Sequence, residues 1–580
     1  MATPRRAGRQ VWRLRLYALA ALLIILTALL TNTVHADLIA TRRAHVAGEA
    51  RSIPDTDVNP YGANFFLTRE VEPWKRDKTL QMAADAGIGW VKQQFAWEEV
   101  EPRRKGEYVD PVSKGSSWAK FDEIVAECEA HGLQIVARLD RPPDWSRQDN
   151  TYKERPPDNP EDYGDYVYAF VERYRGRIDY VQIWNEPNIF PEWGNQPVDP
   201  AAYVELLEVA YRRAKEANPN VRVLSAPLAI TLGESHPEPG KWRSMSDLDY
   251  LDAMYRAGAK DHFDIYSANA FGMDRPPEDP PDPNALNFQR VVLHRRIMER
   301  YGDTNKAVWF NEFGWNAAPA TMSPELLLWR RVDEAQQADY AVRAIEMARD
   351  EWPWAGVFMI WYFRQVGNIP PERADYYFRM VDTDFAPRPL YTAIQAAARR
   401  VSPPGPGLHQ EQNPSVQRAG DWGPVLDAGA SAGGLIRSAT PGDRLSFTFE
   451  GTGLVLHAAR SPDGGRLVAT VDGKPAPALP SGREAAAGTV DLYAAGGREF
   501  VRLTLARDLS PGVHRLELTV APDRHPDATG NTCAIDALEV LSEGHGLSVV
   551  PVTVLGVGIV LDLWLLARTW RRARWVIRAP

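Results

Sequence analysis

Cysteine is almost absent from this chain of 580 residues, which has only Cys128 and Cys533. Two cysteines so far apart in the sequence exclude a stabilising framework of disulfide bonds, whatever the compartment in which the protein resides. The sequence also lacks a cluster of histidine and cysteine with the spacing of metal ligands. We therefore expect no catalytic metal and no cofactor.

The chain is short of neither apolar nor charged residues, with 44% hydrophobic and 25% charged residues, which is typical of globular proteins. Its length favours two or more domains. The formal net charge is −9 although ten arginines lie in the two terminal stretches, so the part between them is distinctly acidic. This charge argues against nucleic acid as a partner and is compatible with a neutral polysaccharide.

Both ends of the chain carry a long apolar run beside a basic stretch. Residues 1–15 are rich in arginine and precede an apolar segment, 16–36, which is either a transmembrane helix or a cleaved signal peptide. A second apolar segment, 547–567, is interrupted by Asp562 and precedes the basic tail 568–580. Because arginine-rich flanks stay in the cytoplasm, we expect a protein of the cell membrane with both termini cytoplasmic and everything between them extracytoplasmic, if the first segment is not cleaved.

Between residues 58 and 400, short β-branched or aromatic runs alternate with segments of helical period. No glycine-rich phosphate loop follows the first run, which argues against a dinucleotide-binding fold. Eight β/α units of this kind predict an α/β protein with a closed (β/α)8 TIM barrel. The predicted strands are 61–66, 90–95, 134–139, 179–184, 221–226, 263–268, 307–312 and 356–361, and the helices between them include 118–131, 200–217, 286–301 and 332–351.

Two of the predicted strands end on a glutamate. Strand four runs into Trp184-Asn185-Glu186-Pro187-Asn188, and strand seven runs into Asn311-Glu312-Phe313-Gly314-Trp315. Burying a carboxylate at the end of an apolar strand costs several kcal/mol unless it is paired, hydrogen-bonded or functional. In a TIM barrel the chemistry lies at the C-terminal ends of the strands, so both glutamates are candidate catalytic residues.

These two motifs resemble the acid/base and nucleophile motifs of the clan A glycoside hydrolases, retaining (β/α)8 enzymes, in a family 39-like or a family 5/cellulase-like form. The resemblance covers most of residues 60–395. It implies that Glu186 is the acid/base, that Glu312 is the nucleophile, and that Asn185 binds the sugar 2-hydroxyl. Aromatic residues at other strand ends are further candidates for binding the substrate, either in the site or in the core: Trp361, Trp97 and Trp145.

The sequence departs from the pattern of that clan at two strands. Strand six carries Asn269 and Phe271 where many members have a histidine and then a tyrosine, and strand two carries Lys92 where an arginine is common. Tyr266 is a candidate replacement for the missing hydroxyl, and Asn269 is a further candidate for binding the substrate. Because side chains alternate along a strand, the sequence alone leaves open whether Tyr266 points inward.

Residues 401–420 are rich in proline and glycine at their start and predict a linker. From 421 to 543, short alternating strands are separated by Gly, Pro and Asp turns, which predicts an antiparallel β-sandwich of the jelly-roll type. The pattern resembles galactose-binding-like modules of extracellular glycosidases, and such a module either binds carbohydrate or acts as a spacer. We favour the spacer, because the segment has no clear aromatic platform.

Taken together, the sequence predicts a membrane-anchored extracytoplasmic retaining glycosidase that acts on β-linked poly- or oligosaccharides. Two alternatives stay open: a transglycosylase that uses the same two glutamates, and a catalytically silent glycan-binding protein.

Overall fold

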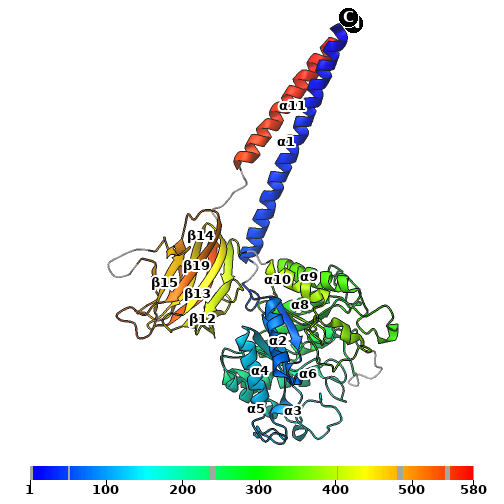
Figure 1. Cartoon of the computed structure of the whole chain (residues 1–580), viewed down its shortest axis with the longest axis vertical. Coiled ribbons are helices and arrows are strands. Elements are labelled where there is room, and N and C mark those ends of the chain that lie inside the picture. The colour runs from blue at the N-terminus through cyan, green and yellow to red at the C-terminus, as the bar shows by residue number, and fades with distance from the viewer. Residues whose placement is uncertain are drawn as a thin grey trace.

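The computed structural model describes residues 4–49, 52–234, 243–400, 403–479, 487–541 and 549–578. Figure 1 shows three parts: a barrel wrapped by helices, a β-sandwich beside it, and two long helices that lie side by side and end at the same extremity of the molecule. The predicted fold class, a (β/α)8 barrel followed by an antiparallel sandwich, is confirmed.

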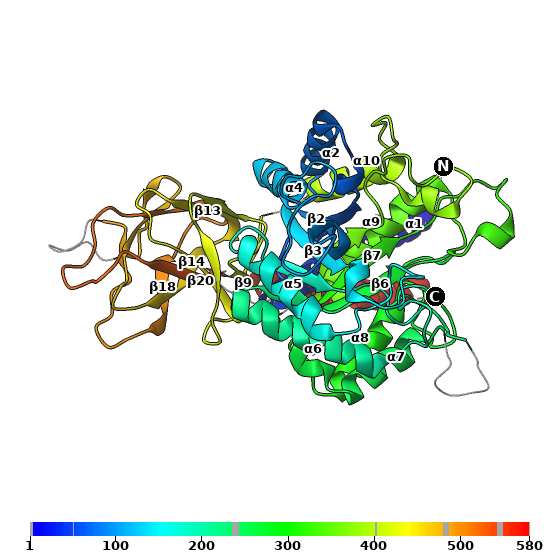
Figure 2. The ribbon, with the colours of Figure 1, turned by 90° about the horizontal axis from the view of Figure 1, so that it is seen from below.

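Eight parallel strands form the barrel, in the order β5-β4-β3-β2-β1-β8-β7-β6. The ring closes between β5 and β6 through a parallel bridge from Leu224 to Ile265. Figure 2 shows barrel strands surrounded by helices. The strands are β1 (Tyr61–Phe65), β2 (Trp90–Ala96), β3 (Gln134–Asp140), β4 (Tyr180–Ile183), β5 (Arg222–Leu224), β6 (Tyr266–Phe271), β7 (Val308–Gly314) and β8 (Ala355–Ile360).

A helix follows each strand and packs an apolar stripe against the barrel wall. In α6, Tyr203, Leu207, Ala210 and Ala214 recur at helical spacing and are buried. Asp199 caps its first turn by accepting from two backbone N–H groups. The helices are α2 (Pro73–Asp85), α4 (Ala119–Ala130), α5 (Pro160–Arg173), α6 (Pro200–Ala217), α7 (Asp247–Arg256), α8 (Arg290–Arg300), α9 (Glu334–Glu351) and α10 (Pro389–Arg399), with a short α3 (Trp97–Val100) after β2.

The interior of the barrel changes from apolar to polar along its axis. Near the start of the strands, Trp90, Tyr180 and Trp309 pack on one another with ring centroids 4.8 to 5.0 Å apart. Two residues further along β2 the inward position is Lys92, which is 3% exposed. The apolar layer therefore closes one end of the barrel, and the polar side chains gather toward the other, where the strands end.

Two antiparallel sheets make up the sandwich, in the orders β10-β13-β19-β15-β16 and β11-β12-β20-β14-β18, with β17 and β9 added at β15 and β20. Their facing side chains form a separate apolar core. The strands are β9 (Gly407–Gln410), β10 (Val416–Ala419), β11 (Gly423–Leu426), β12 (Gly434–Ser438), β13 (Arg444–Gly451), β14 (Gly453–Arg460), β15 (Arg466–Val471), β16 (Lys474–Pro475), β17 (Thr489–Asp491), β18 (Glu499–Ala506), β19 (Gly512–Val520) and β20 (Cys533–Leu541).

The stretch predicted as a linker, 401–420, contributes strands β9 and β10 to the sandwich. It also fixes the sandwich to the barrel. Asp57, which precedes β1 and is 4% exposed, accepts from the backbone N–H of Gln410 at 2.8 Å and from the side chain of Asn413 at 2.9 Å. A carboxylate buried with two donors makes this junction specific rather than a loose tether.

The two apolar terminal segments lie in the helices α1 (Pro4–Glu49) and α11 (Val549–Arg578). The stretches Val11–His35 and Val550–Arg572 are long and apolar enough to cross a membrane, a property that signal sequences also have. The helices run antiparallel and touch (Figure 1), and the position of a Cβ on Gly558 would lie 3.5 Å from Leu26 Cδ1. Both oxygens of Asp562 are buried without a hydrogen-bond partner in the described chain.

Candidate active site

The acid/base candidate lies on a sharply turned segment just after β4. Trp184 and Glu186 both have positive φ values, 73° and 40°, a region that non-glycine residues rarely adopt. The backbone is held there by hydrogen bonds from Trp184 N to Leu139 O at 3.1 Å and from Glu186 N to Pro227 O at 3.0 Å. The neighbouring strand β3 and the loop after β5 therefore enforce a conformation that this segment would not adopt alone.

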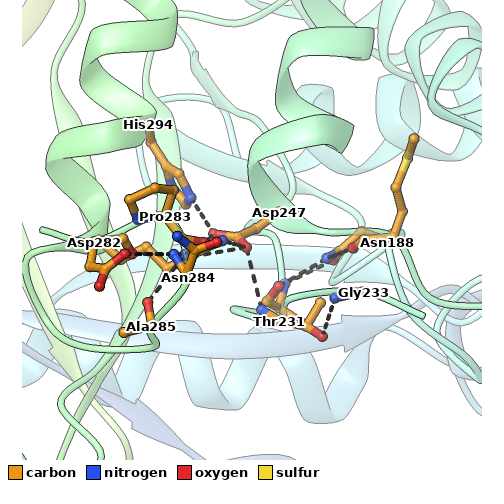
Figure 3. Close-up of polar contacts among 12 residues, drawn as sticks. Asn188, Thr231, Gly233, Asp247, Asp282, Pro283, Asn284, Ala285 and His294 are labelled. Atoms are coloured by element: carbon orange, nitrogen blue, oxygen red, sulfur yellow. Dashed lines mark hydrogen bonds and ion pairs between the residues drawn. The ribbon is translucent and has the colours of Figure 1, made fainter. Parts of the chain in front are cut away.

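Asn188 fixes the far end of the same segment (Figure 3). Its Oδ1 accepts from Ala229 N at 2.8 Å, and its Nδ2 donates to Ala229 O at 2.9 Å. These two hydrogen bonds fix the segment to the loop after β5. The side chain is fully buried. Asn188 thus positions the glutamate two residues before it without touching it.

The nucleophile candidate reaches the barrel interior because of a β-bulge in β7. Strict alternation would place Asn311 and Glu312 on opposite faces of the strand. In the register between β6 and β7, Ala268 is opposite Phe310 but Asn269 is opposite Glu312, so Asn311 is the extra residue. The bulge re-aims the strand, and both Asn311 and Glu312 point inward, which is a common use of bulges beside active sites.

Asn269 connects the two candidate strands. Its Nδ2 donates to Glu186 Oε1 at 2.6 Å, and its Oδ1 lies 3.5 Å from Nδ2 of Asn311. Because Asn269 is the register neighbour of Glu312, the two glutamates lie on either side of this one residue. The structure therefore brings the predicted residues Glu186, Glu312 and Asn269 together.

Lys92 lies beside Glu312, with Nζ 3.4 Å from Oε1. Burial lowers the pKa of Lys92 to about 8, and the charge of Glu312 opposes that decrease. Lys92 was noted in the sequence only as a departure from an arginine pattern, and the geometry gives it a direct contact with the nucleophile candidate.

Glu186 has the opposite electrostatic environment. Burial raises its pKa well above the ordinary value, and the nearby charges of Glu312 and Glu192 raise it further, whereas the hydrogen bond from Asn269 lowers it. Such surroundings favour the protonated form of the carboxyl group. The two glutamates thus differ in their surroundings: Glu186 lies where the protonated form is favoured, and Glu312 lies beside a cation.

Sequence reasoning missed Glu192, a third carboxylate at this end of the barrel. Its Oε2 lies 3.5 Å from Nδ2 of Asn185. Burial raises the pKa of Glu192 to about 7, the charge of Arg138 lowers it, and that of Asp140 raises it. Asp140 in turn accepts from Arg138 at 2.5 Å. Glu192 lies six residues after Glu186 in the sequence, and no motif around it indicates a functional role.

Asn185 and Trp361 also lie at this end of the barrel. Asn185 is 5% exposed, and its Oδ1 has no hydrogen-bond partner in the described chain. Trp361 directly follows β8, is partly exposed, and packs edge-on against Phe66 with ring centroids 6.0 Å apart. Both residues remain candidates for contacting a substrate.

Trp97 lies in the core instead of the site. It is 0% exposed, its ring stacks on Tyr166, and its Nε1 donates to Glu101 Oε2 at 2.6 Å. Trp145 is partly exposed in the loop after β3 and donates to the Glu101 backbone carbonyl at 2.7 Å. The structure therefore does not support a sugar-binding role for Trp97, whereas Trp145 keeps an accessible face.

Tyr266 points out of the barrel, because alternation along β6 places Asn269 inward and the residue three positions earlier outward. It is 0% exposed, with its hydroxyl 3.3 Å from His294 Nδ1 on α8. The expectation that Tyr266 contacts the substrate is corrected accordingly. The hydroxyl belongs to a buried network in which Asp247 lies 2.6 Å from His294 Nε2 and accepts from Arg290 at 2.8 Å (Figure 3).

Within the described residues, no group of three or more His, Cys, Asp and Glu is arranged to hold a metal ion. The described side chains at this end of the barrel carry carboxyl, amide, ammonium, guanidinium and indole groups.

Solved structures similar to this chain include glycoside hydrolases. A family 39 glycoside hydrolase from Bacteroides cellulosilyticus WH2 is 18% identical, with 81% of each chain covered and a TM-score of 0.43. A glucosidase from Croceicoccus marinus is 14% identical, with 82% of this chain and 98% of that chain covered and a TM-score of 0.44. A monomeric β-xylosidase from Caulobacter crescentus CB15 is 14% identical, with 80% and 97% covered and a TM-score of 0.43.

No family model matches the chain, and no curated protein matches it either. Likeness at these identities and TM-scores carries no argument about activity.

Proposed function

We propose that the barrel is a retaining glycosidase that hydrolyses β-linked poly- or oligosaccharides with Glu312 as nucleophile and Glu186 as acid/base. One observation carries the proposal. Two inward-facing glutamates on either side of Asn269 have opposite environments, since Glu312 is paired with Lys92 whereas the pKa of Glu186 is raised. Such a pair is what a double displacement at an anomeric carbon requires.

In the first step, a Glu312 oxygen forms a bond to the anomeric carbon while the bond from that carbon to the leaving oxygen breaks. Glu186 transfers its proton to the leaving oxygen. In the second step, water attacks the anomeric carbon, Glu186 takes a proton from the water, and the ester bond to Glu312 breaks. Lys92 stabilises Glu312 whenever that carboxylate is free.

The remaining polar groups bind and orient the sugar in this proposal. Asn185 contacts the 2-hydroxyl, a contact that strengthens in the transition state, and Trp361 packs against the C–H face of the ring. Trp145 lines a neighbouring subsite from the loop after β3. Asn269 holds the acid/base carboxyl rather than the substrate.

We further propose that the protein is anchored in the cell membrane by α1 and α11, with the barrel and the sandwich extracytoplasmic. The two apolar helices and their arginine-rich outer flanks support this arrangement. The substrate is then a glycan outside the cytoplasm.

The test is a trapping experiment followed by an activity panel, with the full chain in detergent. An activated 2-fluoroglycoside should label Glu312 covalently, and β-glycans or aryl β-glycosides should release product. Glu186→Gln and Glu312→Gln should each lose activity, by about 10²- to 10⁴-fold for the acid, whereas Glu99→Gln, an exposed glutamate paired with Lys120, should not. Absence of label and of product from every substrate would contradict the proposal.

A further inference from the structure

A cleft lies at the opposite end of the barrel from the two glutamates. It has a volume of about 810 Å³ and lies between the barrel and the sandwich. The starts of β2, β3 and β4, at Trp90, Gln134 and Tyr180, form one wall, and the sandwich forms the other with residues around β10 and β11. This volume is within the range of about 300 to 1,000 Å³ that is typical of small-molecule sites.

The cleft is cationic in an otherwise acidic protein. Four arginines line it, Arg175, Arg177, Arg418 and Arg437, against the single carboxylate of Asp179. The chain as a whole has a formal net charge of −9. Because guanidinium groups outnumber carboxylates in the cleft, anions are attracted there more than to the acidic surface of the rest of the protein.

Three of these arginines have no ion-pair partner among the described residues. Arg177 is paired with Glu129 at 2.6 Å. Arg418 donates only to the backbone carbonyl of Glu411, at 2.8 Å, and Arg175 donates to that of Ala217. The exposed side chain of Arg437 makes neither a hydrogen bond nor an ion pair in the described part of the chain. Arg418 is the one of the three on which nearby carboxylates act, since the charges of Glu411 and Asp179 reach it, whereas Arg175 and Arg437 have no carboxylate within ion-pair distance in the described chain.

Two of the uncharged side chains that line the cleft offer unpaired groups for hydrogen bonds. Trp422 lines it, is 7% exposed, and has a buried indole N–H without a partner in the described chain. The exposed amide of Gln134 likewise makes no hydrogen bond within the described ranges. An indole N–H and a side-chain amide can form hydrogen bonds with hydroxyl groups, and guanidinium groups bind carboxylates through two parallel hydrogen bonds.

From these observations we infer that the cleft between the barrel and the sandwich binds an acidic oligosaccharide, a segment of glycan that carries uronate carboxylates. The space is far larger than an inorganic anion needs, and its walls combine cations with donors for hydroxyl groups. The choice of a sugar over another organic anion rests on the proposed function of the barrel. The sandwich then contributes directly to glycan binding, at its junction with the barrel.

The experiment measures binding of tetragalacturonate to the full chain in detergent, by calorimetry, in the Glu312→Gln background so that no hydrolysis can occur. Cellotetraose and inorganic sulfate are the comparison ligands. We expect tetragalacturonate to bind more tightly than either, with an affinity that falls as salt is raised. Arg418→Gln with Arg437→Gln should weaken binding at least tenfold, and Trp422→Phe, which keeps a ring and removes the N–H, should weaken it severalfold.

Arg502→Gln is the matched control, since Arg502 is an exposed arginine on β18, which lies at the opposite edge of its sheet from β11. It should leave binding unchanged, and all variants should melt at the same temperature as the parent. Three results would overturn the inference: no binding of tetragalacturonate, binding that the double arginine variant does not alter, or equal affinity for cellotetraose or sulfate. Binding that depends on the arginines, together with no glycosidase activity in the chain that retains Glu312, would contradict the proposed function but not this binding site.

Discussion

Lys92 and Glu312 form an ion pair inside the barrel, with Nζ of the lysine 3.4 Å from Oε1 of the glutamate and side chains that are 3% and 9% exposed. The pair joins β2 to β7 across the mouth of the barrel. Removing one partner of such a pair leaves a buried charge unpaired, so the state of Lys92 affects the nucleophile directly.

Lys92→Arg should therefore change the pH dependence of kcat/KM. The pKa of Lys92 is lowered to about 8, so its charge is present below that pH and is lost above it. We expect the alkaline limb of the wild-type profile near pH 8, and we expect it at higher pH in Lys92→Arg, because arginine stays charged. A limb at the same pH in both proteins would show that Lys92 does not govern the nucleophile.

Glu192→Gln should lower the pKa of Glu186, because the negative charge of Glu192 helps to raise it. The effect is best measured in the Lys92→Arg background, where the loss of the proton from Glu186 sets the alkaline limb. That limb should then move to lower pH. Glu99→Gln, a change of the same type at an exposed position, is the control, and a limb moving upward in Glu192→Gln would contradict the electrostatic account.

Asn269→Ala should impair the acid/base more than the nucleophile. A hydrogen bond to a charged or charge-developing carboxyl is worth about 1.5 to 3 kcal/mol, which corresponds to about 10- to 100-fold in rate. We expect a decrease of that size in kcat for alkyl glycosides, whose leaving group needs the proton, and a much smaller one for dinitrophenyl glycosides. Equal losses on both substrates would place Asn269 at the nucleophile, and Asn284→Ala, on the loop after β6, serves as control.

Asp247→Ala should destabilise the barrel without a specific effect on catalysis. Asp247 is fully buried and in contact with Arg290 and His294. Removing the carboxylate leaves a buried guanidinium unpaired, at a cost of about 3 to 5 kcal/mol. The melting temperature should fall, whereas Asp249→Ala, two residues along the exposed side of α7, should have little effect. An unchanged melting temperature in Asp247→Ala would contradict this role.

The membrane topology can be tested by labelling single cysteines, because Cys128 and Cys533 are both 0% exposed and give a low background. A membrane-impermeant maleimide should label Val513→Cys, which lies at a position that is 57% exposed, in intact spheroplasts. It should label Gly8→Cys and Ala579→Cys only after lysis. A mature chain that lacks residue 8 would show that the first segment is a cleaved signal, and protection of Val513→Cys before lysis would reverse the proposed topology.

The alternation of strands and helices, and therefore the barrel, could be predicted from the sequence, because each strand and helix has its own local pattern of apolar and polar residues. Eight apolar runs corresponded to the eight strands. The sandwich was predicted from its turns, but β9 and β10 lie in the stretch 401–420 that was predicted as a linker, because two strands of four residues each are too short to show a clear pattern of alternation. The strand pairing of β9 with β20 is decided by contacts distant in sequence.

For the site, the two glutamates could be identified as candidates from the sequence, since burying an acidic residue at the end of an apolar strand is costly unless it has a partner or a function. Which side chains reach the site could not be predicted from the sequence. The bulge at Asn311 turns Glu312 inward, alternation along β6 turns Tyr266 outward, and the loop after β4 folds Glu192 back toward Asn185. These outcomes depend on register and packing between separate strands, which no single segment of the sequence encodes.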